Sequence, residues 1–165
     1  FNAFTLGLQP VDESYTTTYI PTGDFYDVAG ATEAFYQSVA NGAGAVYPFL
    51  GGAHEPIVQL ANDNDIITMS AGASNACGRD DLDYQIAVQF DAGDYLGVIF
   101  DKIQAGELSE GETFVFAVGD FPFVGAVLCD GTDEQVAALD EVKAQIAAGD
   151  FADAFFQIKS DAYGF

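Results

Sequence analysis

The residues best suited to chemistry surround a Gly-Gly turn in the stretch AVYPFLGGAHEP, residues 45–56. The turn leads from a predicted strand into a predicted helix and carries His54, the one histidine of the chain. Such a turn can cradle an anion, hold a catalytic base or form the wall of a site for a small neutral ligand. His54 acting with Asp24 or Asp27 would be the acid–base set of a small flavodoxin-like enzyme.

The motifs that would support an enzyme are missing from the sequence. There is no G-x-S-x-G nucleophile turn and no G-x-x-x-x-G-K-[ST] phosphate loop. The stretch NGAGAV places Gly42 and Gly44 between a helix and the next strand, whereas a dinucleotide fingerprint follows a strand and precedes a helix. Asp27 is predicted to cap a helix, and His54 has no nucleophile to activate. We therefore predict that the chain is not an enzyme and needs no cofactor.

Two acidic loops, residues 62–65 (NDND) and 78–83 (GRDDLD), lack the pattern of a metal site. Neither continues into the glycine and distal glutamate of a calcium loop, and a single histidine cannot build a zinc site. No metal is predicted. Cys77 and Cys129 match no C-x-x-C pattern. They are either a disulfide of an exported protein or two separate core residues, and the sequence leaves both interpretations open.

The charge of the chain excludes one class of partner. There are 26 Asp and Glu residues against 4 Lys and Arg, for a formal net charge of -22. Such a surface repels phosphate backbones and anionic lipid, so nucleic-acid binding is not expected. The charge is typical of a highly soluble surface, one adapted to high salt, or one that captures cations or basic partners. No apolar run approaches the roughly 18 residues of a membrane span.

Strand and helix patterns alternate along the chain. Apolar and β-branched stretches predict strands at residues 15–20, 43–50, 65–69, 84–90 and 113–118, with a further edge strand at 155–159. Helical spacing and capping residues predict helices at residues 27–41, from Pro56 onward, at 91–106 and at 132–148. Phe1, Phe4 and Leu8 have the spacing of a helix tail. In the helix at 91–106, one buried face is predicted, made of Tyr95, Val98, Ile99 and Ile103.

This order of elements predicts an α/β lobe with a three-layer, open, mostly parallel sheet and helices on both faces. Because no internal repeat or linker is evident, residues 1–165 are predicted to form one lobe. In such sheets, ligands bind outside the carboxyl ends of the strands. The loops there (PTGDF, LGGAH, SAGAS and QFD) contain Gly, Ser, Gln, Phe and His but no Lys or Arg. They predict a wall that stacks and hydrogen-bonds a neutral solute.

The same loops resemble those of a known family, the basic membrane protein (BMP) group of ABC-transporter substrate-binding lipoproteins. The stretch YIPTGDFYDVAGATEAFYQSVANGAGAVYPFLGGAHEPI is similar to that family's strand, G-S-F-x-D turn, helix, second strand and A-G-G turn. The stretch QFDAGDYLGVIFDKIQAGELSEGETFVFAVGD resembles its V-D-x-A-V-Y helix and K-x-G-x-F-x-G-G-x-Y-x-x-G segment. GAVLCDGTDEQVAALDEVKAQIAAGD resembles its closing segment. The resemblance covers nearly the whole chain from Tyr15.

The resemblance implies a type I periplasmic-binding fold, in which two lobes close on a purine nucleoside or a similar small polar or aromatic solute. This chain would be most of the second lobe, with the first lobe absent, and its partners would be that first lobe and an ABC-transporter permease. The implied location is extracellular or periplasmic, with a lipid anchor on the full-length form. A sensory ligand-binding lobe and the His54 enzyme are the alternative functions.

The resemblance also assigns binding residues. Phe25 matches the aromatic residue that stacks on the base, and Gly51 with Gly52 matches the turn that approaches the ligand. At the place of the family's acidic motif this chain has TMSAGA, which offers Ser70. Val88 or Gln89 stands where the family has a lysine. We therefore expect Phe25 to stack on the solute, Gly51 and Gly52 to allow close approach, and Ser70 and Gln89 to form hydrogen bonds.

Overall fold

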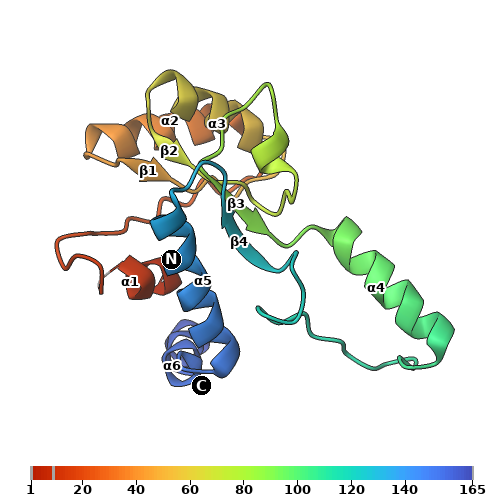
Figure 1. Ribbon diagram of the computed structural model, residues 1–165. Helices are drawn as coiled ribbons and strands as arrows, with labels where there is room; N and C mark the ends of the chain where they lie inside the picture. Colours follow the sequence, from red (N-terminus) through yellow and green to blue (C-terminus); the bar gives the residue numbers. More distant parts are fainter. Residues whose placement is uncertain (1, 9, 165) are drawn as a thin grey trace.

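A computed structural model of the chain describes residues 2–8 and 10–164 (Figure 1). Phe1, which was predicted to belong to a helix, lies outside these residues. The first element is α1 (Asn2–Leu8), so the helix predicted at this end is confirmed for the described residues. The following residues 15–20 were predicted to be a strand, and this prediction is wrong: they adopt no strand, and neither sheet of the described residues includes them. A β-branched stretch without a neighbouring ladder cannot form a sheet.

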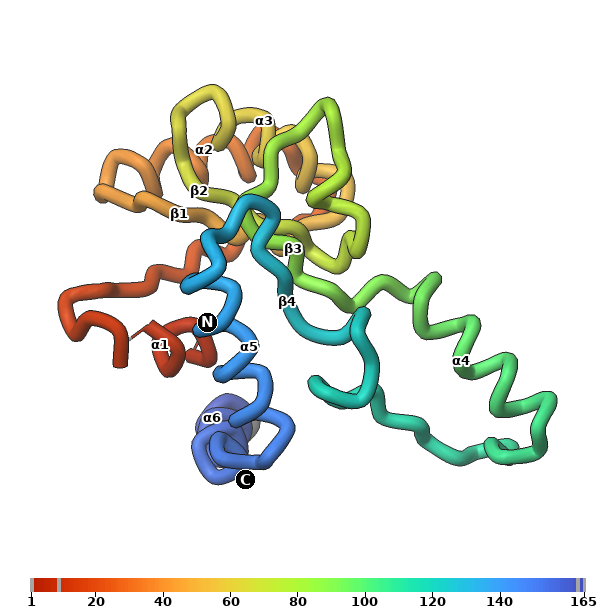
Figure 2. Tube along the Cα trace, in the orientation of Figure 1, coloured from red at the N-terminus to blue at the C-terminus, as the bar shows by residue number. Residues whose placement is uncertain are grey.

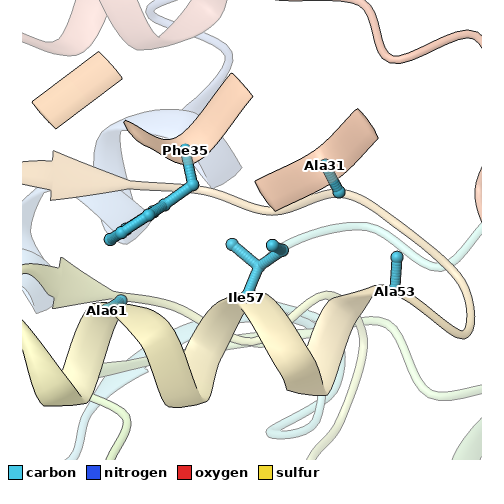
Figure 3. Close-up of a cluster of buried hydrophobic side chains, with 5 residues drawn as sticks. All are labelled: Ala31, Phe35, Ala53, Ile57 and Ala61. Atoms are coloured by element: carbon cyan, nitrogen blue, oxygen red, sulfur yellow. The ribbon is translucent and has the colours of Figure 1, made fainter. Parts of the chain in front are cut away.

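Two helices supply the best-buried part of the molecule. In α2 (Val28–Ala40), the predicted cap is confirmed, because Asp27 Oδ1 accepts a hydrogen bond from Gly30 N at 3.0 Å. The second helix, α3 (His54–Asp63), follows the Gly-Gly turn. Figure 3 shows how small and large apolar side chains from the two elements interlock. The cluster consists of Ala31, Phe35, Ala53, Ile57 and Ala61.

The strands form two small sheets within the described residues. In the parallel sheet, β1 (Ala45–Val46) pairs with β2 (Ile67–Thr68). In the antiparallel sheet, β3 (Ile86–Gln89) pairs with β4 (Gly125–Leu128). A parallel bridge between Met69 and Ile86 links β2 to β3. The chain is therefore a mixed α/β protein with short parallel and antiparallel sheets.

A second apolar cluster fills the space between α3 and the antiparallel sheet. It contains Val58, Ala76, Leu82, Tyr84 and Ala87. A disulfide between Cys77 and Cys129 joins the 3-10 turn η1 (Ala76–Gly78) to the residue that follows β4. The structure thus decides between the two interpretations that the sequence left open for these cysteines.

The segment between β3 and β4 projects away from the sheets. It consists of α4 (Ala92–Ala105) and the returning residues 106–124, and we call residues 92–124 the arm (Figures 1 and 2). Asp91 caps α4 as predicted, through Gly93 N at 2.8 Å, and Gly106 ends it in the left-handed conformation. The predicted buried face is wrong, since α4, all of which is described, buries none of its residues.

The returning part of the arm replaces a predicted strand. Residues 113–118 are almost entirely apolar but form no ladder within the described chain, and Val118 makes only an isolated bridge to Phe121. The rings of this segment pack on the helix instead. Tyr95 of α4 stacks on Phe116 with ring centroids 4.3 Å apart. The fourth strand of the structure, β4, comes from the GAVL residues that follow.

Two helices complete the chain. The capping box of α5 (Asp133–Ala148) is confirmed, because Gln135 N donates to Thr132 Oγ1 and Thr132 N donates to Gln135 Oε1. Residues 155–159 were predicted to be an edge strand but belong to α6 (Ala152–Tyr163). Helical spacing of Phe155 and Ile158 overrides the local β-propensity there. In the part of the chain that the structure describes, no helix is long and apolar enough to cross a bilayer.

Candidate binding site

Three phenylalanine rings form a row, and two of them follow the carboxyl ends of β1 and β3. Phe49 lies three residues after β1, Phe90 directly follows β3, and Phe25 lies three residues before α2 begins at Val28. Ring centroids lie 6.3 Å apart between Phe25 and Phe49 and 6.2 Å apart between Phe49 and Phe90. Their exposed fractions are 54%, 56% and 40% for Phe25, Phe49 and Phe90. We call these three rings the aromatic row.

Two further rings extend the contacts of the aromatic row, through its central residue Phe49. Tyr47 lies 5.9 Å from Phe49, and Phe4 of α1 lies 5.4 Å from Tyr47, between ring centroids. Burial raises the pKa of the Tyr47 hydroxyl. Tilted and edge-to-face pairs of this kind favour a fixed relative orientation of the rings. The aromatic row is therefore held in place at the central ring, while each of its three residues stays partly exposed to solvent.

The Gly-Gly turn packs directly on the aromatic residues. The backbone carbonyl of Phe25 accepts hydrogen bonds from Gly51 N at 3.1 Å and from Ala53 N at 3.2 Å. A Cβ on Gly52 would lie 2.8 Å from Cδ1 of Tyr26, and one on Gly51 would lie 3.4 Å from Cβ of Phe25. The structure thus brings the predicted residues Phe25, Gly51 and Gly52 together. In the structure, the two glycines come close to Phe25 and Tyr26. Their approach to a ligand remains a prediction.

A cavity of about 530 Å³ lies beside the turn. Its wall is made by the turn itself, the first residues of α3 and the loop that follows β2. The lining residues are Leu50, Gly51, Gly52, His54, Glu55, Pro56 and Ala71. The hollow is open to solvent, and it adjoins the aromatic row through Gly51 rather than being lined by its rings.

His54 is engaged on both ring nitrogens. Its Nδ1 lies 2.6 Å from the carbonyl oxygen of Pro48, so Nδ1 carries the proton and donates it. Its Nε2 lies 3.3 Å from the hydroxyl of Tyr84, and the two rings stack with centroids 6.0 Å apart. Burial is the main cause that raises the pKa of Tyr84. These contacts tie the residues before the turn to the second apolar cluster.

The two aspartates proposed to work with His54 serve the backbone. Asp24 Oδ1 accepts from Tyr26 N at 2.8 Å, and Asp27 Oδ1 accepts from Gly30 N at 3.0 Å. The contacts of His54 are with Pro48 and Tyr84. The geometry therefore gives all three side chains a part in local structure.

Ser70 lies inside the molecule. Its side chain is completely buried, and its Oγ accepts a hydrogen bond from Val88 N at 3.0 Å. The same oxygen lies 3.3 Å from the carbonyl oxygens of Ala73 and Val88. The hydroxyl thus forms hydrogen bonds that link the residues after β2 to β3. Gln89, the other predicted hydrogen-bonding residue, is the last residue of β3, is partly exposed and directly precedes Phe90.

Sequence reasoning missed Phe49 and Gly72. Phe49 was placed inside the predicted strand at 43–50, but β1 ends at Val46. The signal was present in Pro48, which cannot donate to a strand ladder. Gly72 has a φ of +90°, and a Cβ there would lie 2.8 Å from the Phe90 ring. Glycine is required at this position both by its backbone conformation and by the ring beside it.

Charges near the cavity are paired. Glu55, which lines it, accepts from Arg79 Nη1 at 2.8 Å, and Arg79 Nε also donates to Asp81 at 2.6 Å. Hydrogen bonding to Asp81 and then to Glu55 raises the pKa of Arg79 well above its ordinary value. At the base of α4, Ser74 donates to Asp94 at 2.5 Å. Among the described residues, no group of three or more His, Cys, Asp or Glu could hold a metal ion.

Comparisons with protein-family models, with curated proteins and with solved structures find no significant match to this chain. The likeness to the basic membrane protein family therefore stays a prediction from the sequence. The candidate site rests on the geometry of the chain itself.

Proposed function

We propose that the chain is a solute-binding lobe of an exported uptake system and not an enzyme. The observation that carries the proposal is the exposed aromatic row, which lies at the carboxyl ends of β1 and β3 beside the Gly-Gly turn and its cavity. Ligands of parallel α/β sheets bind at this edge. The proposed solute is small and polar or aromatic, and a purine nucleoside is one candidate.

The exposure of the aromatic row supports the idea that a second lobe covers it. Large apolar side chains in contact with one another on a surface mark interaction or ligand sites more often than isolated ones. In the proposed arrangement, Phe25, Phe49 and Phe90 form one wall and the first lobe of a type I periplasmic-binding protein forms the other. Closure of the lobes would bury the solute and exclude water.

The finer architecture belongs to the same proposal. The parallel pairing of β1 with β2 and the parallel bridge from Met69 to Ile86 support a larger, mostly parallel sheet. We propose that this sheet is the centre of a three-layer lobe with helices on both faces. The chain would be the second lobe of a lipoprotein of the basic membrane protein type, and an ABC-transporter permease would receive the solute.

Two further observations favour this function over the alternatives. The disulfide between Cys77 and Cys129 supports an extracellular or periplasmic location, because disulfides persist in oxidising compartments. The contacts of both His54 nitrogens with Pro48 and Tyr84 support a structural role for that ring. A free base would be needed for the enzyme alternative.

The test is a titration of the folded chain with nucleosides, sugars and amino acids, followed by backbone amide NMR shifts. NMR suits the weak binding expected of one wall without the other. Phe25→Ala and Phe49→Ala should each weaken binding by about 1–3 kcal/mol if the rings stack on the solute. Phe156→Ala is the matched control, since that ring is exposed on α6. Binding that is unchanged in Phe25→Ala and Phe49→Ala would contradict the proposal.

A further inference from the structure

The faces of the aromatic row carry a partial negative charge. An aromatic ring attracts a cation placed over its face, and quaternary ammonium groups are the ligands that use this contact most. The chain already makes one such contact within the arm, where Lys102 Nζ lies 4.7 Å from the centroid of Phe114. Phe25, Phe49 and Phe90 can offer the same chemistry to a solute, because these residues are partly exposed, with exposed fractions of 54%, 56% and 40%.

Two residues of the aromatic row have an aspartate as their neighbour in the sequence. Asp24 precedes Phe25 and Asp91 follows Phe90 in the sequence. Each is held by a backbone N–H group, that of Tyr26 for Asp24 and that of Gly93 for Asp91, both at 2.8 Å. These bonds hold each carboxylate in a local turn, and a neutral N–H donor leaves the carboxylate charge in place. The N-terminus of a helix favours an anion. At α2 and α4 this position is already taken by the capping carboxylates of Asp27 and Asp91, so neither helix offers it to an anionic solute.

The basic residues of the chain are committed to other parts of the molecule. Arg79 pairs with Glu55 and Asp81, Lys102 pairs with Glu107 in the arm, and Lys143 pairs with Asp140 in α5. The remaining one, Lys159, lies in α6. With a net charge of -22, the surroundings of the aromatic row repel an anion and attract a cation.

We propose that the solute bound at the aromatic row is an organic cation with a methylated ammonium head group. This inference rests on the proposed function and narrows it to a class of solute. An anionic solute is repelled by the net negative charge of the chain. A neutral solute gains only stacking and apolar contact. A methylated ammonium gains contact with the ring faces together with the attraction of Asp24 and Asp91, and it loses less hydration than a primary ammonium.

The experiment compares two solutes of the same shape with the folded chain at low ionic strength. One is choline, and the other is its neutral isostere, in which a tert-butyl group replaces the trimethylammonium group. Adenosine is titrated as a neutral heterocycle. Amide shifts give the dissociation constants. Choline should bind about tenfold more tightly than its isostere. Added salt should reduce this ratio, because it screens the attraction between the choline head group and the carboxylates.

Variants separate the contributions of ring and charge. Phe49→Leu keeps an apolar side chain but removes the ring, so it should abolish the preference for choline. Asp24→Asn with Asp91→Asn should weaken choline binding and leave the isostere unchanged, because each amide retains an oxygen that accepts the same backbone hydrogen bond. Phe156→Leu is the control on α6. A dispersed amide spectrum of each variant shows that it is folded.

The outcomes distinguish this inference from the function it rests on. If the isostere or adenosine binds as tightly as choline and Phe49→Leu weakens that binding, the aromatic row is a solute site but its ligand is not a cation. If neither choline nor any neutral solute shifts the amides around Phe25, Phe49 and Phe90, the proposed function fails as well.

Discussion

Ser70 completes the junction between β2 and β3 with its side chain, since its Oγ accepts the hydrogen bond of Val88 N at 3.0 Å. Ser70 N itself donates to Ile86 O at 2.9 Å, so one residue supplies two links between the strands. Thr68, two residues earlier, is also completely buried. Its backbone N donates to Gln85 Oε1, while its Oγ1 has no hydrogen-bond partner among the residues that the structure describes. The two hydroxyls therefore contribute to stability with opposite sign.

Ser70→Ala should destabilise the fold by about 1–3 kcal/mol, because it leaves Val88 N buried without a partner. Thr68→Val removes an unpaired buried hydroxyl at nearly constant shape, so stability should be unchanged or higher. Urea unfolding of both variants measures the difference. Equal losses in the two variants would contradict the assigned roles.

Removing the disulfide should lower stability by about 4 kcal/mol, because Cys77 and Cys129 close a loop across a separation of 52 residues. The variant is the double change Cys77→Ser and Cys129→Ser, and urea unfolding gives the free energy. A reducing agent should reproduce this loss in the parent chain and have no effect on the variant. Equal stability of the two chains without reductant would show that the bond does not constrain the unfolded state.

Gly72→Ala should displace the ring of Phe90. The residue has a φ of +90°, and the added Cβ would meet that ring at 2.8 Å. We expect a stability loss of about 1–3 kcal/mol from backbone strain, together with weaker solute binding at the aromatic row. Gly97→Ala in α4 is the matched control, because a Cβ there meets nothing within 4 Å. A Gly72→Ala chain that binds solute like the parent would argue against a role for Phe90.

Substitutions on the exposed and the packed faces of the arm should affect stability differently. Leu96, Phe100 and Ile103 form an exposed stripe on α4, whereas Phe116 stacks on Tyr95. Phe100→Gln should change stability by no more than about 0.5 kcal/mol and reduce binding of a dye that reports exposed apolar surface. Phe116→Ala should cost about 1–2 kcal/mol through lost ring contacts and speed amide exchange in α4. A large loss of stability in Phe100→Gln would mean that the stripe is covered in solution.

Asp81 should titrate below its usual value of 3.8, because the hydrogen bond from Arg79 lowers its pKa. Since the folded-state pKa is depressed, the contribution of this pair to stability is present above the unfolded pKa and is lost as the pH falls through the folded one. NMR titration of the Asp81 carboxyl group measures the shift. Arg79→Gln should return the pKa towards 3.8, while Lys143→Gln, which removes a different ion pair, should leave it unchanged.

Helix ends were predictable because they depend on local chemistry. Asp27, Asp91 and Thr132 begin helices through side-chain hydrogen bonds to nearby N–H groups, and Gly106 and Gly149 end helices in the left-handed conformation. These features involve only a few consecutive residues. The same sequence rules therefore located α2, α4 and α5 without knowledge of the rest of the chain.

Strands were harder to predict because a strand requires a partner. Residues 113–118 alternate as a half-buried strand would, with Val115 69% exposed between the more buried Phe114 and Phe116. Those rings pack with Tyr95 of α4 and with other rings of the same segment. Alternating exposure shows that one side of the segment packs against another element. It does not show whether that element is a sheet or a helix.

The structure brings together only some of the residues that the sequence selected for the candidate site. The rule that strand ends carry ligands selected the loops PTGDF, LGGAH, SAGAS and QFD, and the family resemblance assigned Phe25, Gly51 and Gly52 within them. The structure brings these three residues together. Ser70 was selected by the same rule, but its hydroxyl is used between strands. Which face of a strand end points outward depends on the register with β3, and this pairing could not be read from local sequence.

The disulfide has a further consequence for the arm. Because Cys77 and Cys129 lie on either side of residues 92–124, the whole arm is part of a covalent ring closed by the sulfur–sulfur bond. A protease that nicks the exposed link between α4 and residue 114 would open this ring without dividing the molecule. Both pieces would stay joined by the disulfide and by the pairing of β3 with β4. The arm could thus be cut, shortened or replaced while the remainder of the chain stays one molecule.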